Sequence, residues 1–161
     1  MRPKPIKPEP GQESVWDYPR PARCEEIDKH IRVVLDGRTI AETRRAKRVL
    51  ETSHPPTYYI PKEDVDMDLF ELHPKRTVCE WKGGSIYYTF KNSDRIVAWA
   101  YPDPTPGFIP IKDCIGLYAH AFDECYVDGE QVQAQPGDFY GGWITKDIVG
   151  PFKGGPGTWG W

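Results

Sequence analysis

Residues 77–101 read TVCEWKGGSIYYTFKNSDRIVAWAY and decide the fold. The runs 77–81, 86–90 and 95–101 are rich in β-branched and aromatic residues, which suit a pleated surface. Glycine at 83 and 84 reaches positive φ without a steric clash, so it favours a tight turn after the first run. We therefore predict a three-stranded antiparallel meander. We expect it to end at Pro102-Asp103-Pro104, because proline cannot donate to a ladder.

Two further hairpins are indicated by Asp-Gly pairs between apolar runs. Asp36-Gly37 separates 31–35 from 38–41, and Asp128-Gly129 separates 125–127 from 130–132. Both central residues of a type I′ turn need positive φ, which Asp-Gly supplies. The pattern therefore predicts antiparallel strand pairs on either side of the meander.

Composition agrees with a mainly β fold: a compact antiparallel barrel-like or folded sheet. The 161 residues are only 39% hydrophobic, yet 13% are aromatic and six are tryptophan, so large rings must supply much of the buried area. Seventeen prolines and fifteen glycines leave little room for long helices. We expect one short helix after Pro61, where Val65, Leu69 and Leu72 are spaced i, i+4, i+7.

Three parts of the chain are distinguished by composition. Residues 1–22 form a Pro/Lys-rich arm, extended or disordered, which Trp16 and Tyr18 would hold to the body. Residues 23–135 form the β domain, and 136–161 form a Gly/Trp-rich extension. We expect the extension to pack on the domain as ordered coil and to bury Phe139, Tyr140, Trp143, Phe152, Trp159 and Trp161.

The sequence pattern fits two alternative secondary structures in each of two segments. The basic run 44–48 fits a short helix or a strand, and the strand is favoured because His54-Pro55-Pro56 follows closely. Residues 114–122 fit a strand or a short helical turn, and the pattern does not decide between them.

Charge and cysteine spacing exclude several classes of function. The net charge is −3, no apolar run approaches the ~20 residues of a membrane span, and the N-terminus has no apolar signal region. Cys24, Cys79, Cys114 and Cys125 form no C-x-x-C pair. We therefore expect a cytoplasmic protein with reduced thiols, no metal, no cofactor and no membrane partner.

Nucleic acid is not an expected partner. Arg44, Arg45, Lys47 and Arg48 lie close to two tyrosines, which is a pattern that phosphate contacts and base stacking use. One such cluster in an acidic protein more often forms a solvated face, and we favour that interpretation.

A small-molecule pocket is the first functional hypothesis, because aromatic walls provide affinity and a few polar groups fix orientation. Its candidate ligand-binding residues are Tyr58, Tyr59, Trp81, Tyr87, Trp99 and Tyr101. The alternative is an enzyme whose candidate catalytic residues are Glu51, His54, Cys79 and Lys82. A histidine beside a carboxylate can serve as a general base. More ordinary roles compete with this: a loop histidine on a rigid turn, and a packed core thiol.

Two apparent motifs carry no chemistry. Residues 64–68 begin like a calcium loop, but its required glycine and glutamate are replaced by Leu69 and Lys75. Gly83-Gly84-Ser85 resembles the start of a nucleotidyltransferase site, but Ile96 occupies the place of a second carboxylate. An acidic segment and a hairpin turn explain these patterns.

The chain resembles a known family over about residues 30–133. The matching motifs are Gly37…Ala41, Arg45-Ala46, Val49-Leu50-Glu51, Pro56-Thr57-Tyr58-Tyr59-Ile60-Pro61, Asp64-Val65, residues 77–83, Ala98-Trp99-Ala100-Tyr101-Pro102 and residues 126–130. They resemble the domain of unknown function 427 family, which also carries a nucleotidyltransferase label. The resemblance implies a compact, mostly β domain and brings no catalytic residue with it. The extension is similar to one that some members carry.

Three functional hypotheses follow. They are a small organic ligand in an aromatic pocket, an enzyme at the Glu51/His54/Cys79/Lys82 region, and a protein-interaction domain that uses the 139–161 tail. The oligomeric state is open, with a homodimer as one alternative.

Overall fold

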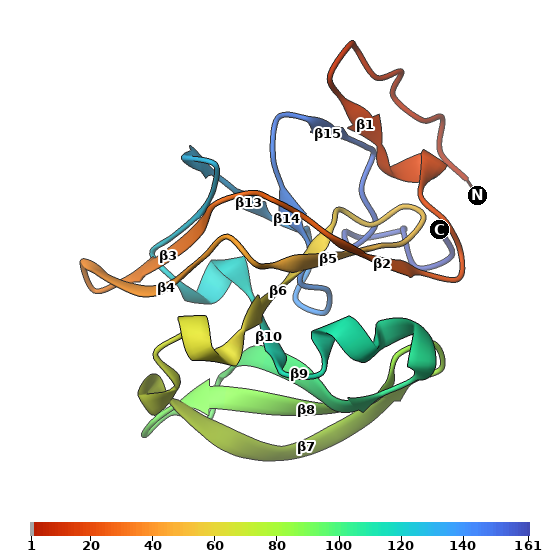
Figure 1. Cartoon of the computed structure of the whole chain (residues 1–161). Helices are drawn as coiled ribbons and strands as arrows, with labels where there is room; N and C mark the ends of the chain where they lie inside the picture. Colours follow the sequence, from red (N-terminus) through yellow and green to blue (C-terminus); the bar gives the residue numbers. More distant parts are fainter. Residues whose placement is uncertain (1) are drawn as a thin grey trace.

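Two antiparallel sheets build most of the structure, a computed structural model that describes residues 2–161 (Figure 1). The larger sheet has the strand order β2-β5-β6-β10-β9-β8-β7, and the smaller has the order β12-β11-β3-β4. Within residues 2–161 the outer strands β2 and β7 do not pair with each other. The fold is therefore a folded open sheet, and the barrel alternative does not hold. The strands outside the meander are β2 (Arg23–Glu26), β3 (Ile31–Leu35), β4 (Arg38–Thr43), β5 (Lys47–Leu50), β6 (Thr57–Pro61), β10 (Cys114–Leu117), β11 (Glu124–Val127) and β12 (Glu130–Gln131).

Both Asp-Gly hairpins are confirmed. Asp36 and Gly37 have φ of 52° and 74°, and Asp128 and Gly129 have φ of 48° and 81°. These positive values are what a tight turn between twisted strands requires. They join β3 to β4 and β11 to β12, and β11 then pairs with β3 to complete the smaller sheet.

The meander is confirmed as β7 (Phe70–Cys79), β8 (Gly83–Phe90) and β9 (Ile96–Pro104). Trp81 lies in the turn after β7 and not in the strand. The expected stop at Pro102 is wrong, because β9 continues to Pro104. The β9–β10 pairs are limited to Ala98 and Trp99, so beyond them β9 pairs only with β8. Proline nitrogens on an unpaired side need no ladder partner.

The predicted helix after Pro61 is wrong. The segment forms two single 3₁₀ turns, η2 (Lys62–Asp64) and η3 (Met67–Leu69), before β7 begins. The reason is a competing partner: Asp66 donates its amide to the carbonyl of Ile40 at 2.8 Å, and Val65 bridges Ala41. The longest helical segment among residues 2–161 is η4 (Pro106–Ile111), and no helix there is long and apolar enough to cross a membrane.

The two open segments are settled by strand pairing. The basic run bends at Arg44 and then enters β5, so the preference for a strand is confirmed from Lys47 onward. Residues 114–122 contain both alternatives: β10 is followed by the 3₁₀ turn η5 (Ala119–Ala121).

The larger sheet separates two clusters of buried side chains. One, here called the filled face, joins it to the smaller sheet and contains Ile31, Val33, Ile40, Tyr58, Ile60, Val97, Ile115, Leu117 and Trp143. The other, here called the cavity face, contains Val49, Tyr59, Trp99, Tyr101, Phe108, Ile111 and Cys114. Side chains alternate across a strand, so β6 sends Tyr58 to the filled face and Tyr59 to the cavity face.

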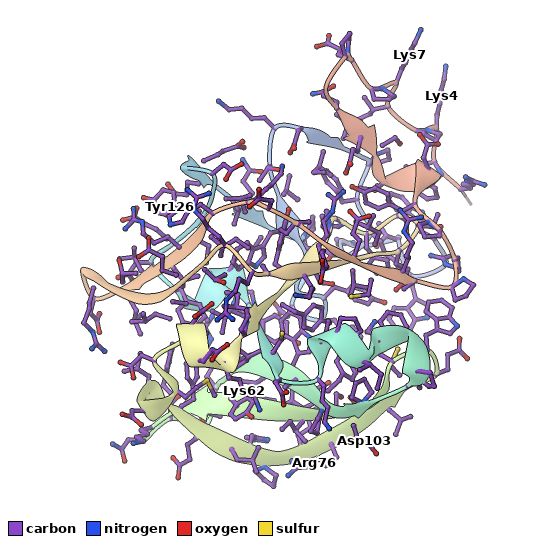
Figure 2. The ribbon with its side chains drawn as sticks, in the orientation of Figure 1. Lys4, Lys7, Lys62, Arg76, Asp103 and Tyr126 are labelled. Carbon is purple, nitrogen blue, oxygen red and sulfur yellow. The ribbon has the colours of Figure 1, made fainter. Side chains whose placement is uncertain are left out.

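The arm and the extension pack together at one end of the molecule (Figure 1). Strand β1 (Glu13–Ser14) pairs in parallel with β15 (Ile148–Val149), and Val15, Trp16 and Tyr18 are buried beside Ile148. Lys4 and Lys7 project away from this end (Figure 2). The arm is therefore extended and held by its aromatic residues, as expected.

The predicted burial of the extension's six rings is confirmed only in part, since Tyr140, Phe152 and Trp161 are half-buried. Trp143 is 1% exposed, in β14 (Trp143–Ile144), which pairs with β13 (Gln133–Ala134). Phe139 and Trp159 are 67% and 77% exposed, so their predicted burial is wrong. The two exposed rings contact each other edge to face instead, with centroids 6.5 Å apart.

Candidate functional site

A cavity of about 540 Å³ opens on the cavity face of the larger sheet. Its floor comes from β6, β8 and β9, one wall from the turn after β7, and another from the segment before β6. The opposite wall belongs to the extension. Its principal lining residues are Glu51, His54, Thr57, Tyr59, Lys75, Thr77, Cys79, Trp81, Lys82, Tyr87, Trp99, Tyr101, Tyr118, Gln135, Phe139 and Tyr140.

The floor is a rigid assembly of rings around Trp99. Its indole nitrogen donates to the Tyr59 hydroxyl at 3.1 Å, with the two rings edge to face at 84°. A Cβ at Gly116 would lie 2.4 Å from the Trp99 ring, and one at Gly141 would lie 2.3 Å from it. Only glycine fits at either place, so the indole is held between β10 and the extension. Tyr118 lies against it with centroids 4.6 Å apart.

The polar end of the cavity starts from a turn between β5 and β6. The amide of His54 donates to the Glu51 carbonyl at 3.0 Å, and Ser53 within this turn has φ of 74°. A positive φ at a residue other than glycine is strained, and such strain concentrates at functional sites. The turn brings both the Glu51 and the His54 side chain to the cavity, with Nε2 of His54 3.3 Å from Oε2 of Glu51.

Gln135 fixes the proton on His54. Its Oε1 accepts from the Gly142 amide at 3.0 Å, so its Nε2 is the donor that contacts the Lys153 carbonyl at 2.8 Å and His54 Nδ1 at 3.1 Å. Nδ1 must then accept, and in the neutral ring Nε2 carries the hydrogen. His54 therefore donates to Glu51, and neither ring nitrogen is left to take a proton from a ligand.

Glu51 is an ionised acceptor. Burial alone raises the pKa of its carboxyl, but the hydrogen bond from His54, the charge of His54 when it is protonated, and the charges of Lys82 and Arg20 outweigh burial and hold the pKa below its usual range. Arg20 lies 3.8 Å from Oε2 of Glu51. A carboxylate with a lowered pKa is a weak base but a strong hydrogen-bond acceptor.

Tyrosine hydroxyls supply the other polar groups. Tyr101 is 9% exposed, and burial raises the pKa of its phenol strongly, so it stays a neutral donor and acceptor. Its hydroxyl has no protein partner among residues 2–161, although it lines the cavity. The Tyr87 hydroxyl, by contrast, is hydrogen-bonded to Thr77 at 2.7 Å. Lys75 lies 4.9 Å from the centre of the Tyr87 ring, and Lys82 lies 5.6 Å from that of Tyr101.

The structure brings together most of the residues singled out in the sequence. Glu51, His54, Cys79, Lys82, Tyr59, Trp81, Tyr87, Trp99 and Tyr101 all line the cavity. Tyr58 lies on the filled face, 2% exposed against Trp143. Sequence reasoning missed Tyr118 and Gln135. A tyrosine just after β10 is a weak indication of an aromatic pocket, but nothing in the sequence links a lone glutamine to His54, 81 positions away.

The basic run meets carboxylates of its own chain. Arg45 pairs with Glu63 and Asp64, Lys47 with Glu26, and Arg48 with Glu13 and Glu25. A guanidinium already held by carboxylates has fewer donors left for phosphate. This geometry favours the solvated-face interpretation of residues 44–48.

The cysteines are free thiols. Burial raises the pKa of Cys114 to about 11 and that of Cys125 to about 12, so both remain protonated near neutral pH. Cys79 lines the cavity and is partly exposed. Among residues 2–161, no group of three or more His, Cys, Asp or Glu side chains is placed to hold a metal ion.

The chain belongs to the domain of unknown function family DUF427, whose sequence profile matches residues 23–128 of the 161. No curated protein matches the chain significantly. The matched range contains the cavity floor, Glu51 and His54, but it ends before Gln135, Phe139, Tyr140 and Gly141. One wall of the cavity therefore comes from outside the matched segment.

Proposed function

We propose that this protein binds a small organic molecule in the cavity between the larger sheet and the extension. The observation that carries the proposal is a pocket of about 540 Å³ that is rich in aromatic side chains and whose polar groups include the Tyr101 hydroxyl, which has no hydrogen-bond partner among residues 2–161. Pockets for small ligands have volumes of ~300–1,000 Å³ and combine apolar walls with a small number of oriented polar groups. This hydroxyl is not fully enclosed, so a ligand in the cavity would supply the partner that it lacks.

The experiment titrates the ¹⁵N-labelled protein with a library of small aromatic fragments. Each of the six tryptophans gives one indole N–H signal in a two-dimensional spectrum. Binding in the cavity shifts the signals of Trp81 and Trp99 and leaves that of Trp16 unchanged. Trp81→Ala weakens binding by about tenfold, because a ring contact contributes about 1 kcal/mol beyond its buried area.

Tyr126→Ala is the matched control, because Tyr126 lies in β11 of the smaller sheet and is not a lining residue. It should leave fragment affinity unchanged. Fragments that shift only Trp16, or bind Trp81→Ala as tightly as the wild type, would show that the cavity is not a binding site.

The enzyme alternative has one favourable observation: Glu51, His54, Cys79 and Lys82 all line this cavity. Against it, both ring nitrogens of His54 are engaged and Glu51 is a weak base. An enzyme that uses Cys79 requires a thiol that reacts with a disulfide reagent faster than a model thiol at the same pH. A rate equal to that of the model thiol removes this alternative.

A further inference from the structure

We propose that the ligand is a neutral planar ring whose edge carries an N–H or O–H donor, and that Glu51 accepts the hydrogen bond from this donor. The inference rests on the proposed small-molecule function and names the chemical class of the molecule. It depends on three features of the cavity: a preset acceptor, a local balance of charge, and flat walls.

The acceptor is preset by the hydrogen-bond chain Gly142–Gln135–His54–Glu51. Gly142 donates to Gln135, one amide hydrogen of Gln135 goes to His54 while the other goes to Lys153, and His54 donates to Glu51. This chain occupies Oε2 of Glu51. The contacts of His54 and Arg20 with the carboxylate are at Oε2, and Oε1 accepts no hydrogen bond from residues 2–161, although the side chain lines the cavity and is 23% exposed. An ionised carboxylate oxygen can only accept hydrogen bonds, so a ligand that complements it must carry a donor.

The charge around Glu51 favours a neutral ligand. Arg20 lies 3.8 Å from its carboxylate, and Lys82 acts on it from the wall of the cavity. A cationic ligand would meet these two charges as well as Glu51. An anionic ligand would meet the carboxylate at short range. A neutral donor gains a charge-assisted hydrogen bond without either repulsion.

The shape of the cavity favours a flat ring. Trp99 and Tyr59 are locked by their mutual hydrogen bond, and Gly116 and Gly141 leave no side chain that can move aside. Rigid rings form flat surfaces, and a planar ligand contacts them by stacking or edge to face at little conformational cost. The Tyr101 hydroxyl lies in the same cavity and adds a second polar contact.

The test uses two matched pairs of probes: indole with 1-methylindole, and phenol with anisole. Within each pair methylation removes the donor and keeps the ring. Affinities are measured from the shifts of the Trp81 and Trp99 indole signals, for the wild type and for Glu51→Gln. The glutamine is isosteric, but its oxygen must accept from His54, so its amide hydrogens face the cavity. Glu80→Gln, at an exposed carboxylate on the same cavity, is the control.

The donor-bearing probe of each pair should bind the wild type about tenfold tighter than its methylated partner, since a hydrogen bond to a charged group is among the stronger ones. Glu51→Gln should abolish this preference and Glu80→Gln should keep it. Equal binding within the pairs, or a preference that survives Glu51→Gln, overturns the inference while leaving the binding site in place. If none of the four probes shifts Trp81 or Trp99, and no fragment of the library does, the proposed function fails as well.

Discussion

Tyr58 and Tyr59 are neighbours in β6, yet they lie in very different surroundings. Tyr58 is 2% exposed on the filled face, where it packs against Trp143 with ring centroids 5.3 Å apart. Tyr59 is 1% exposed on the cavity face, where its hydroxyl accepts from Trp99. The filled face is dominated by isoleucine, valine and leucine, whereas the cavity face is dominated by rings.

This difference shows how one sheet can build both a core and a pocket. Branched aliphatic side chains interdigitate and leave few voids. Large flat rings that are fixed by hydrogen bonds and by close glycines cannot close around one another. The filled face therefore stabilises the protein. The rings of the cavity face pack less closely and leave an opening. The predictions below test this division.

The largest expected effect belongs to the filled face. Trp143 is 1% exposed and donates its indole hydrogen to the Leu117 carbonyl at 3.0 Å. Trp143→Ala should lower the free energy of unfolding by about 3–5 kcal/mol, because it leaves a large void and an unpaired carbonyl. Urea denaturation measures this change. Trp159→Ala, at an exposed ring, should change stability by no more than about 0.5 kcal/mol. Similar losses in the two variants would contradict the assignment of Trp143 to a tightly packed core.

A smaller effect is expected where the cavity floor is tightest. In Gly116→Ala the new Cβ would meet the Trp99 ring at 2.4 Å, so the indole must shift. The free energy of unfolding should fall by about 1–3 kcal/mol, as it does at other overpacked sites, and the indole N–H signal of Trp99 should shift. Gly107→Ala is the control, because nothing lies within 4 Å of its added methyl group. An unchanged Trp99 signal in Gly116→Ala would contradict a locked floor.

Gln135→Leu should lower the free energy of unfolding by at most about 3 kcal/mol. The change leaves the Gly142 amide, the Lys153 carbonyl and His54 Nδ1 without their present partner. Its specific signature is the His54 tautomer, read from ¹⁵N chemical shifts of the ring. In the wild type the hydrogen should sit on Nε2, and in Gln135→Leu this preference should weaken. A hydrogen on Nδ1 of the wild type would invalidate the assignment of donors.

The smallest effect should be the pH dependence at Glu51. Its pKa is lowered in the folded state from an ordinary value of 4.5, so its charge contributes stability that is fully present above that value. The contribution is lost as the pH falls through the folded pKa. The stability difference between the wild type and Glu51→Gln should therefore shrink as the pH falls below about 4.5. A difference that grows on acidification would mean that the folded pKa is raised.

The local parts of the fold were predictable because they depend on neighbouring residues. Asp-Gly pairs fix a turn wherever they occur between apolar runs, and the alternation of residues 77–101 already indicates strands. The segment after Pro61 misled the prediction, because its helical spacing is real but Ile40 and Ala41, from β4, take its backbone contacts. Phe139 and Trp159 misled the prediction because an aromatic residue type does not show whether the folded chain offers that ring a place in a core.

The sequence by itself determined the strands, their hairpins and the abundance of rings that makes an aromatic site plausible. It also placed Glu51 and His54 in one turn, since three positions separate them. The tertiary structure alone decided that Gln135 sets the proton on His54, that Tyr59 and not Tyr58 faces the cavity, and that the extension closes one wall. These outcomes depend on contacts between residues far apart in the chain, where strand register and the path of the extension fix which side chains meet.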